Sequence, residues 1–406
     1  MPNPHLPPEL LNYIVDLLHD DPDALKKCCL VSKSWIPRTR KHLFADVELS
    51  TEEHLESWKN TFPDPSASPV CFTKSLRVES ADVVEAAGAE AEAGSWLRGF
   101  SRIVHLGVET QDMDPGEMVI SLTPFHGLSD TIKSLRVGSI FFPPSWIFDL
   151  ILSFPLLEDL VVTGYSASTD DDDDDDCSSA AVRPLNPPVF TGALELRLEE
   201  GLRPIASRLL SLPDAVRFRK LTLTWHCGED IPLTMALVRE CSHVLETLNI
   251  IFDLSGEFIQ CLSPLTDNSP RFPAESMPTS LDLSAATKLK VVTFRIDTWD
   301  VNWITAALRT ITPEHRELRQ ISIDPANYSF YASLGAGARR RGREERFIGQ
   351  WLELDRLLVQ VWESRSISLK LLYDALVHEE RAVREWMKWL LPVTTGGGMV
   401  DLANIW

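Results

Sequence analysis

Apolar residues recur at helical spacing in two short segments at the start of the chain. A proline at position 8 suits the first turn of a helix, where its missing N–H would have no partner. Asp20 to Asp23 then supply an acidic cap and a second proline. The pattern predicts two amphipathic helices back to back, with the second running to Trp35. Their apolar positions are Leu10, Leu11, Ile14, Val15, Leu17 and Leu18, followed by Leu25, Cys28, Cys29 and Val31.

A different pattern, apolar-x-x-apolar-x-apolar, recurs after residue 50. Its centres lie 25 to 30 residues apart, except across two longer stretches that hold an aspartate run or a group of prolines. The centres are Leu106, Leu135, Leu160, Leu221, Leu248, Val292 and Ile321, with weaker copies at Leu76 and at Ala193/Leu196/Leu198. Between them, helical periodicity predicts helices over 145–152, 202–212, 233–244, 301–311 and 347–362. Strand, loop and helix at this period predict units that bury their apolar faces by stacking.

These patterns predict an α/β fold in three parts. We expect a helical domain over residues 1–50, a strand–loop–helix solenoid over 51–391 with an acidic insert at 166–189, and a tail over 392–406. The segment from Leu371 to Leu391 is predicted to be a C-terminal capping helix, because the last unit of a stack needs a cover for its apolar edge. The alternatives are an ordinary α/β domain and a generic helical hairpin that caps a larger domain.

The first fifty residues resemble the F-box. The resemblance rests on Leu6-Pro7-Pro8-Glu9, the apolar helix, the acidic proline turn and the ending Leu30-Val31-Ser32-x-Ser34-Trp35, and it covers about residues 5–48. Ser32 stands where the motif often has Cys. The resemblance implies docking onto the Skp-family adaptor of a cullin–RING ubiquitin ligase. The residues implied in adaptor binding are Leu6, Pro7, Leu10, Ile14, Leu25, Val31 and Trp35.

The stacked units resemble an irregular leucine-rich-repeat array, which often accompanies an F-box. The Asn expected after each strand is mostly missing here. Taken together, the resemblances imply a substrate-recognition subunit of an SCF-type ligase, or alternatively a non-degradative F-box scaffold. Charged residues on the open, concave face of the strands would then bind the target protein. These residues are Glu109, Arg136, Arg197, Glu199, Arg295 and Asp324.

Composition and charge narrow the class of partner. The net charge of −20 argues against nucleic acid, because phosphate binding needs clustered Lys and Arg. The run Asp170–Asp176 lacks the spacing and glycine of a calcium loop, so we interpret it as a solvated insert. An odd number of cysteines without Cys-x-x-Cys predicts neither disulfides nor zinc. The chain shows no signal pattern and no long apolar run, which predicts a cytoplasmic or nuclear protein without a membrane partner.

No pattern predicts catalysis. Gly335 to Arg343 lacks the Lys-Ser/Thr of a phosphate-binding loop, and Gly164 to Ser168 lacks the final glycine of a nucleophile elbow. His226 and Cys227 would point to opposite faces of a strand. We therefore expect no enzyme activity, metal or cofactor, and an enzyme site assembled from distant residues remains the alternative.

Charges separate within the first fifty residues. Up to Asp23 there are five acids and no Lys or Arg, whereas the segment from Lys26 to Lys41 holds six bases and no acid. A basic end beside exposed aliphatic residues would suit an acidic partner. The alternative is that these cations serve the C-terminal ends of helices.

Overall fold

The structure, a computed structural model, describes residues 7–63, 68–80, 99–109, 130–138, 144–165, 188–198, 203–212, 214–225, 230–252, 281–296, 301–324, 341–365, 367–373 and 390–404, with the single residues 83, 97, 125, 128 and 388. Leu6, Glu199 and most of the predicted acidic insert lie outside the described residues. The chain divides into two compact units, Met1–Val189 and Phe190–Trp406.

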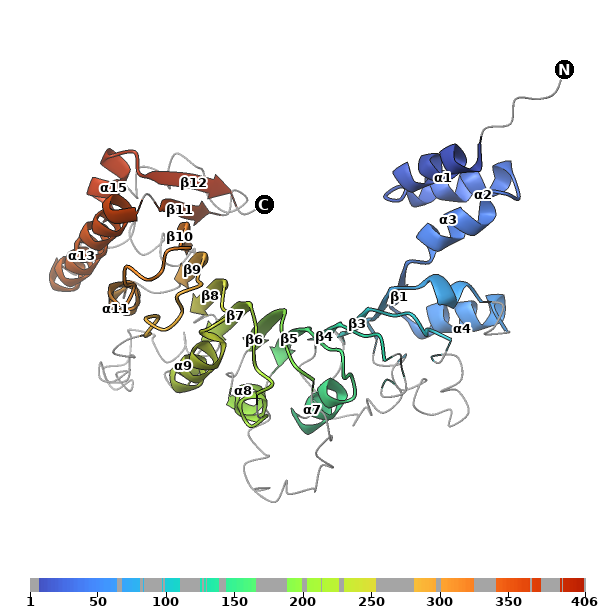
Figure 1. Cartoon of the computed structure of the whole chain (residues 1–406), viewed down its shortest axis with the longest axis horizontal. Helices are drawn as coiled ribbons and strands as arrows, with labels where there is room; N and C mark the ends of the chain where they lie inside the picture. Colours follow the sequence, from blue (N-terminus) through green and yellow to red (C-terminus); the bar gives the residue numbers. More distant parts are fainter. Residues whose placement is uncertain are drawn as a thin grey trace. The chain divides into compact units, whose positions relative to one another are not determined.

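The first unit begins with three short helices, α1 (Pro8–Leu17), α2 (Pro22–Val31) and α3 (Ile36–Leu43) (Figure 1). We call them the helical module. Pro8 and Pro22 occupy the first positions of α1 and α2, and the side chain of Asp21 accepts a hydrogen bond from the Ala24 N–H at 2.9 Å. The predicted second helix ends earlier than expected, because Ser32 is extended and the unpredicted α3 begins at Ile36, with Pro37 in its first turn.

Five strands follow in the same unit and pair in parallel, in chain order. The predicted centres Leu76, Leu106, Leu135 and Leu160 lie opposite one another in register, and each is at most 1% exposed. The predicted repeat is therefore confirmed here. The strands are β1 (Asp46–Leu49), β2 (Ser75–Val78), β3 (His105–Glu109), β4 (Ser134–Gly138) and β5 (Asp159–Tyr165), with α4 (Glu52–Thr61), the 3₁₀ helix η1 (Pro69–Phe72) and α7 (Pro144–Leu152) between them.

Strand β1 changes the predicted boundary at residue 50. It starts at Asp46 inside the segment expected to be helical only, and its Val47 pairs in register with Leu76. Phe44, Val47 and Leu49 fit the repeat template. The sheet of the first unit thus begins directly after α3.

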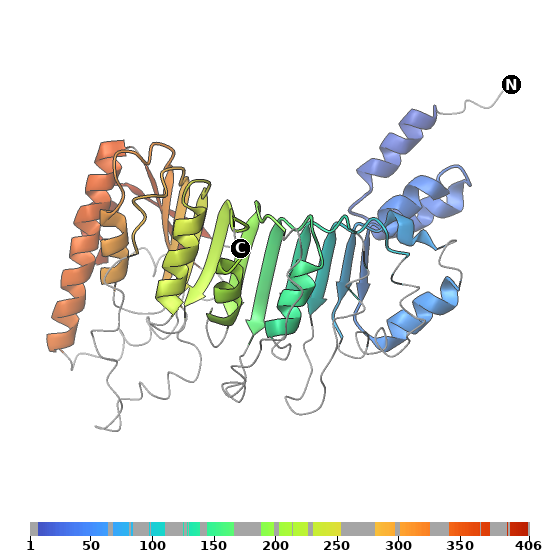
Figure 2. The same cartoon turned by 60° about the horizontal axis from the view of Figure 1, so that its bottom comes forward.

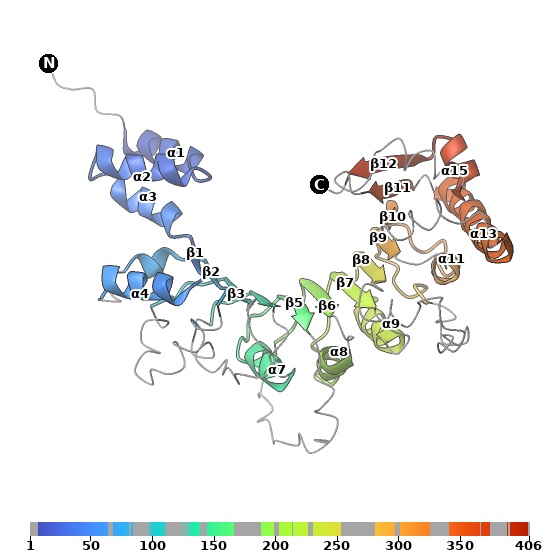
Figure 3. The same ribbon diagram turned by 180° about the vertical axis from the view of Figure 1, so that it is seen from behind.

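The second unit repeats the arrangement with seven strands, again parallel and in chain order. Its helices α8, α9, α11 and α13 lie on the same side of the row of strands, as two opposite views show (Figures 1 and 3). The elements are β6 (Ala193–Leu198), α8 (Arg203–Leu210), β7 (Lys220–Trp225), α9 (Asp230–Cys241), β8 (Thr247–Phe252), β9 (Val291–Ile296), α11 (Asn302–Arg309), β10 (Gln320–Asp324), α13 (Arg341–Arg365), β11 (Ser368–Tyr373), α15 (Pro392–Gly396) and β12 (Val400–Asn404).

The five helices predicted between the strands are present within two turns of their expected ends, and the described chain is α/β with a solenoid-like order. Seen from the side, the strands of each unit stand next to one another with their helices along one face (Figure 2). None of the described helices combines the length and apolar composition that a bilayer crossing requires.

A hydrogen-bond pattern that the sequence did not reveal repeats at the start of successive strands. The Ala45 carbonyl accepts from the N–H groups of both Lys74 and Ser75, at 2.8 and 3.0 Å. The same double acceptance joins strands β1 to β5 in the first unit and strands β6 to β10 in the second. It recurs at the carbonyls of Lys74, Val104, Lys133, Gly192, Arg219, Glu246 and Lys290.

Two predictions about the second unit are wrong in detail. Leu194, not Leu196, pairs with Leu221, so the β6 repeat lies two residues earlier than predicted. The mistake arose because Thr191 stands at the first template position of the true repeat, while Ala193, Leu196 and Leu198 fit the template better.

The predicted capping helix also begins too early. Leu371 to Tyr373 belong to β11, and most of the remaining segment up to residue 389 lies outside the described residues. The expected tail over 392–406 instead carries α15 and β12, which pairs in parallel with β11. In the described chain the last strand of the row is therefore β12.

Candidate functional site

A stripe of exposed apolar side chains runs along α1. Leu10, Tyr13, Ile14 and Leu17 are 49%, 61%, 37% and 64% exposed. Their spacing of three, one and three residues places them on one side of the helix. We call these four residues the α1 stripe. Burying the rest of these side chains against a partner would contribute roughly 3–6 kcal/mol.

The opposite side of α1 faces the rest of the module. Val15 is 1% exposed, and the other buried residues of the three helices are Leu25, Cys28 and Thr39. Thr39 is fully buried and donates a hydrogen bond to the Trp35 carbonyl at 2.9 Å. The α1 stripe is therefore left unused by the core of the module itself.

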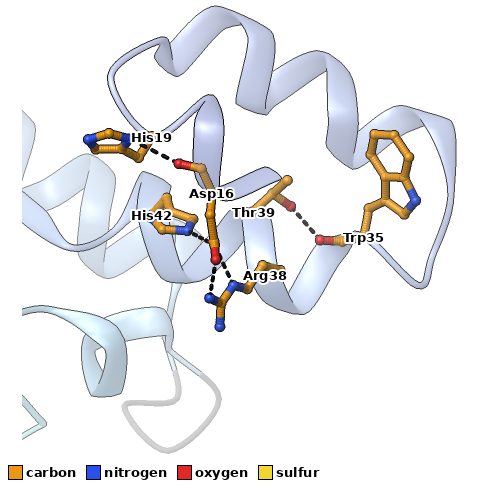
Figure 4. A network of polar contacts seen from close by, with 6 residues as sticks. All are labelled: Asp16, His19, Trp35, Arg38, Thr39 and His42. Atoms are coloured by element: carbon orange, nitrogen blue, oxygen red, sulfur yellow. Dashed lines mark hydrogen bonds and ion pairs between the residues drawn. The ribbon is translucent and has the colours of Figure 1, made fainter. Parts of the chain in front are cut away.

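An ion-pair network fixes which side of α1 faces outward (Figure 4). Arg38 on α3 donates to the Asp16 carboxylate from Nε at 2.6 Å and from Nη2 at 2.5 Å, and His42 Nε2 lies 2.7 Å from the same carboxylate. The hydrogen bond from Arg38, followed by that from His42, holds the pKa of the Asp16 carboxyl well below its usual range. This two-pronged contact ties α1 to α3 in one rotational setting.

A second exposed apolar patch lies at the end of α2. Leu30 is 88% exposed and Val31 is 67% exposed, which makes Leu30 the most exposed of the large apolar side chains in the described residues. We call this pair the α2 tip. Monomeric proteins rarely keep several large apolar side chains in water at neighbouring helical positions unless they bind a partner.

The structure sorts the residues that the resemblance implied in adaptor binding. Pro7, Leu10, Ile14 and Val31 are exposed, whereas Trp35 is half-buried. Leu25 was wrongly placed among them, because it is 1% exposed and belongs to the core of the module. Leu6 lies outside the described residues.

Three exposed residues, Tyr13, Leu17 and Leu30, were missing from that set. The first two could have been found from their spacing relative to Leu10 and Ile14.

Charged residues predicted on the open face of the first unit form a pair. Glu109 and Arg136 lie on neighbouring strands, on the face opposite the buried Leu106 and Leu135. Arg136 Nη1 is 3.6 Å from Glu109 Oε1, and the two side chains are 47% and 18% exposed. The side chain of Glu109 lies over Gly138, where an added Cβ would come within 3.0 Å of it. Arg136 is therefore the member that faces solvent.

The same division holds in the second unit. Arg295 is 41% exposed and lies 3.8 Å from Asp324, whose side chain is only 8% exposed. Arg197 is 53% exposed and contacts Glu195 at 2.8 Å. Each predicted arginine is thus held by a carboxylate that is more buried than the arginine itself. Glu199 lies outside the described residues.

Other chemistry is sparse in the described part of the chain. There, no three side chains of His, Cys, Asp or Glu are grouped so that they could hold a metal ion. Burial raises the pKa of the Cys241 thiol to about 12, so this cysteine is a core residue and a poor nucleophile.

No model of a known protein family matches the sequence, and a search of curated proteins finds no significant match.

Proposed function

We propose that this protein is a substrate-recognition subunit of an SCF-type cullin–RING ubiquitin ligase. In this proposal the helical module is an F-box that docks on a Skp-family adaptor, and the strands form a leucine-rich-repeat-like array that binds the target protein. The chain itself performs no chemistry. It raises the local concentration of the target near the ligase, which makes ubiquitin transfer effectively intramolecular.

The observation that carries the proposal is the α1 stripe beside a motif that resembles the F-box. A free-standing three-helix module would turn Leu10, Ile14 and Leu17 inward if they served only its own stability. Instead they are exposed, and the Asp16–Arg38 contact holds the other side of α1 against α3. A docking module needs such a surface, whereas a simple cap on the sheet does not.

For the array, the proposal assigns target binding to the open face of the strands. Arg136, Arg197 and Arg295 are the exposed charges there, and their carboxylate neighbours orient them. Arginines held in this way lose less conformational freedom when they bind a carboxylate or phosphate of a partner. The regular register of the strands supports a continuous recognition face within each unit, and the missing Asn after each strand departs from the usual leucine-rich repeat.

Affinity purification of the full chain from cells tests the proposal. We expect a Skp-family adaptor and a cullin to co-purify, together with target proteins whose recovery falls in Arg136→Ala or Arg295→Ala variants. The matched control is Arg309→Ala, since Arg309 is exposed on α11 and not on the open face. Recovery of the adaptor without a cullin would favour the non-degradative scaffold, and recovery of neither would refute the proposal.

A further inference from the structure

Two arginines share one row on the open face of the second unit. Thr224 of β7, Ile251 of β8 and Arg295 of β9 are paired in register, and the register of β6 with β7 places Arg197 beside Thr224. Neighbouring strands lie about 4.8 Å apart, so three strand spacings separate the two arginines by about 14 Å along the row. The row therefore presents two guanidinium groups at a fixed separation.

Neither arginine spends all its donors on its carboxylate neighbour. The Nε of Arg295 lies 3.8 Å from Asp324, which is too long for a hydrogen bond, and the arginine side chain is 41% exposed. Arg197 contacts Glu195 through Nε at 2.8 Å, and its side chain is 53% exposed. A guanidinium has five N–H donors, so both side chains can still donate to a carboxylate of a partner.

The surface between the two arginines is uncharged. Ile251 lies next to Arg295 in the row and is partly exposed. The parallel row two residues earlier in the strands holds Thr222, Asn249 and Thr293, which are also partly exposed, and the Asn249 amide donates to the Thr222 hydroxyl at 3.1 Å. Hydroxyl and amide groups can hydrogen-bond with the main chain of a peptide, and Ile251 can contact an apolar side chain.

The open faces of the two units differ in the sign of their charge. The face of β1 to β5 has more acids than bases, whereas the face of β6 to β10 has more bases than acids, and its acids are more buried than the arginines they contact. An acidic segment would therefore be repelled by the first face and attracted by the second. The charges are Asp46, Glu48, Glu109, Asp159, Arg77 and Arg136 on the first face, and Glu195, Asp324, Arg197, Lys220 and Arg295 on the second.

We propose that an acidic, extended segment of the target protein binds across β6 to β9, with one carboxylate on Arg197 and a second, four residues away, on Arg295. An extended chain rises about 3.4 Å per residue, so four residues span about 14 Å. Residues two and four positions apart point to the same side, which places the middle side chain over Ile251. The segment thus has the pattern acidic-x-apolar-x-acidic. The inference rests on the proposed function, because it names the class of target that the array binds.

The test is the affinity of the full chain for capped, fluorescently labelled nine-residue peptides, measured by anisotropy at low salt. The first peptide has Glu at its third and seventh positions, Leu at its fifth, and Ser or Gly elsewhere. The matched control peptide has its second Glu at the sixth position, which keeps the charge and turns that carboxylate to the other side. The protein variants are Arg197→Gln and Arg295→Gln. Their control is Arg309→Gln, since Arg309 is also exposed and paired but lies on α11.

We expect the wild type and Arg309→Gln to bind the first peptide equally, and each of the other two variants to bind it about tenfold more weakly, because each loses hydrogen bonds to a charged group. The wild type should also bind the control peptide about tenfold more weakly than the first. Equal affinity for the two peptides, or variants that bind as the control does, would overturn the inference. So would the absence of saturable binding by the wild type below about 1 mM.

Saturable binding of the phosphoserine form of the first peptide, without binding of the glutamate form, would overturn the assignment of carboxylates as the ligand. Recovery of a Skp-family adaptor by a chain that ignores the first peptide would overturn the inference and leave the proposed function intact. Binding of the first peptide with the expected dependence on spacing, by a chain that recovers no adaptor, would support the inference and mark the distinct failure of the proposed function.

Discussion

Replacement of Asp355 by Ala should loosen the C-terminal end of the second unit. Asp355 lies on α13 and is fully buried. Its carboxylate accepts hydrogen bonds from the Val393 N–H at 2.8 Å, the Thr394 N–H at 3.0 Å and the Thr394 hydroxyl at 2.8 Å. These are the first donors of α15, so a single side chain caps that helix and fixes it to α13.

The magnitude follows from what the substitution leaves behind. Three donors lose their acceptor, and Thr394 is fully buried, so water cannot readily replace the carboxylate there. An orphaned buried donor costs about 1–3 kcal/mol, and the exposed Val393 site can recover part of its loss. We expect the free energy of opening this segment to fall by about 4 kcal/mol for Asp355→Ala. Asp355→Asn keeps one acceptor oxygen for Thr394 and should cost about 2 kcal/mol.

Hydrogen exchange of the peptide over residues 390–397 measures this opening directly. Since about 1.4 kcal/mol is a tenfold change, the Val393 and Thr394 amides should exchange about a thousandfold faster in Asp355→Ala. The control is Glu353→Ala on the same helix, whose exposed pair with Arg309 should contribute at most about 1 kcal/mol. Equal exchange in the two variants would refute the assignment of Asp355 as the residue that fixes α15.

Three further predictions concern the first unit. Leu25→Ala should destabilise the helical module by about 2–5 kcal/mol in urea unfolding, because Leu25 is 1% exposed, whereas the exposed Leu10→Ala should change the midpoint little. The folded pKa of Asp16 lies below its unfolded value near 3.9, so the stabilisation by its carboxylate is complete above that pH and is lost as the pH falls further. Thermal melts followed by circular dichroism from pH 6 to pH 2 should therefore show a smaller acid-induced fall in melting temperature for Asp16→Asn than for the wild type. Trp58→Ala should lower the free energy of unfolding by about 2 kcal/mol in thermal melts, because the centroid of the Trp58 ring lies 5.0 Å from that of Phe62 and 5.8 Å from that of Phe44. A loss of less than about 0.5 kcal/mol would contradict this packing.

The strand–loop–helix repeat was predictable because each of its strands buries one face against the helices. A leucine or equivalent at the same place in each strand must face the helices, and the structure pairs Leu76, Leu106, Leu135 and Leu160 accordingly. The β6 register was not predictable from the template alone, because a polar Thr191 occupied a position that the pattern requires to be apolar. Packing against Leu221, not local sequence, selects Leu194.

The α1 stripe could be predicted only in part. Helix α1 is apolar on two sides, so periodicity identified Ile14 and Val15 alike and could not say which faces the core. The contact between Asp16 and Arg38 decides this, and it joins residues 22 positions apart. Likewise, alternation along a strand placed Glu109 and Arg136 on the open face, but their pairing depends on the register between strands.

The affinity of the full chain for a purified Skp-family adaptor tests the central proposal most directly. Titration calorimetry would compare the wild type with Leu10→Ala/Leu17→Ala and with the control Leu156→Ala/Val393→Ala, whose residues are also about half exposed. We expect the wild type and the control to bind equally, and the stripe variant to bind about a hundredfold more weakly, since each docking residue contributes more than about 1 kcal/mol. A wild-type chain that does not bind, or a stripe variant that binds as tightly as the control, would contradict the proposal.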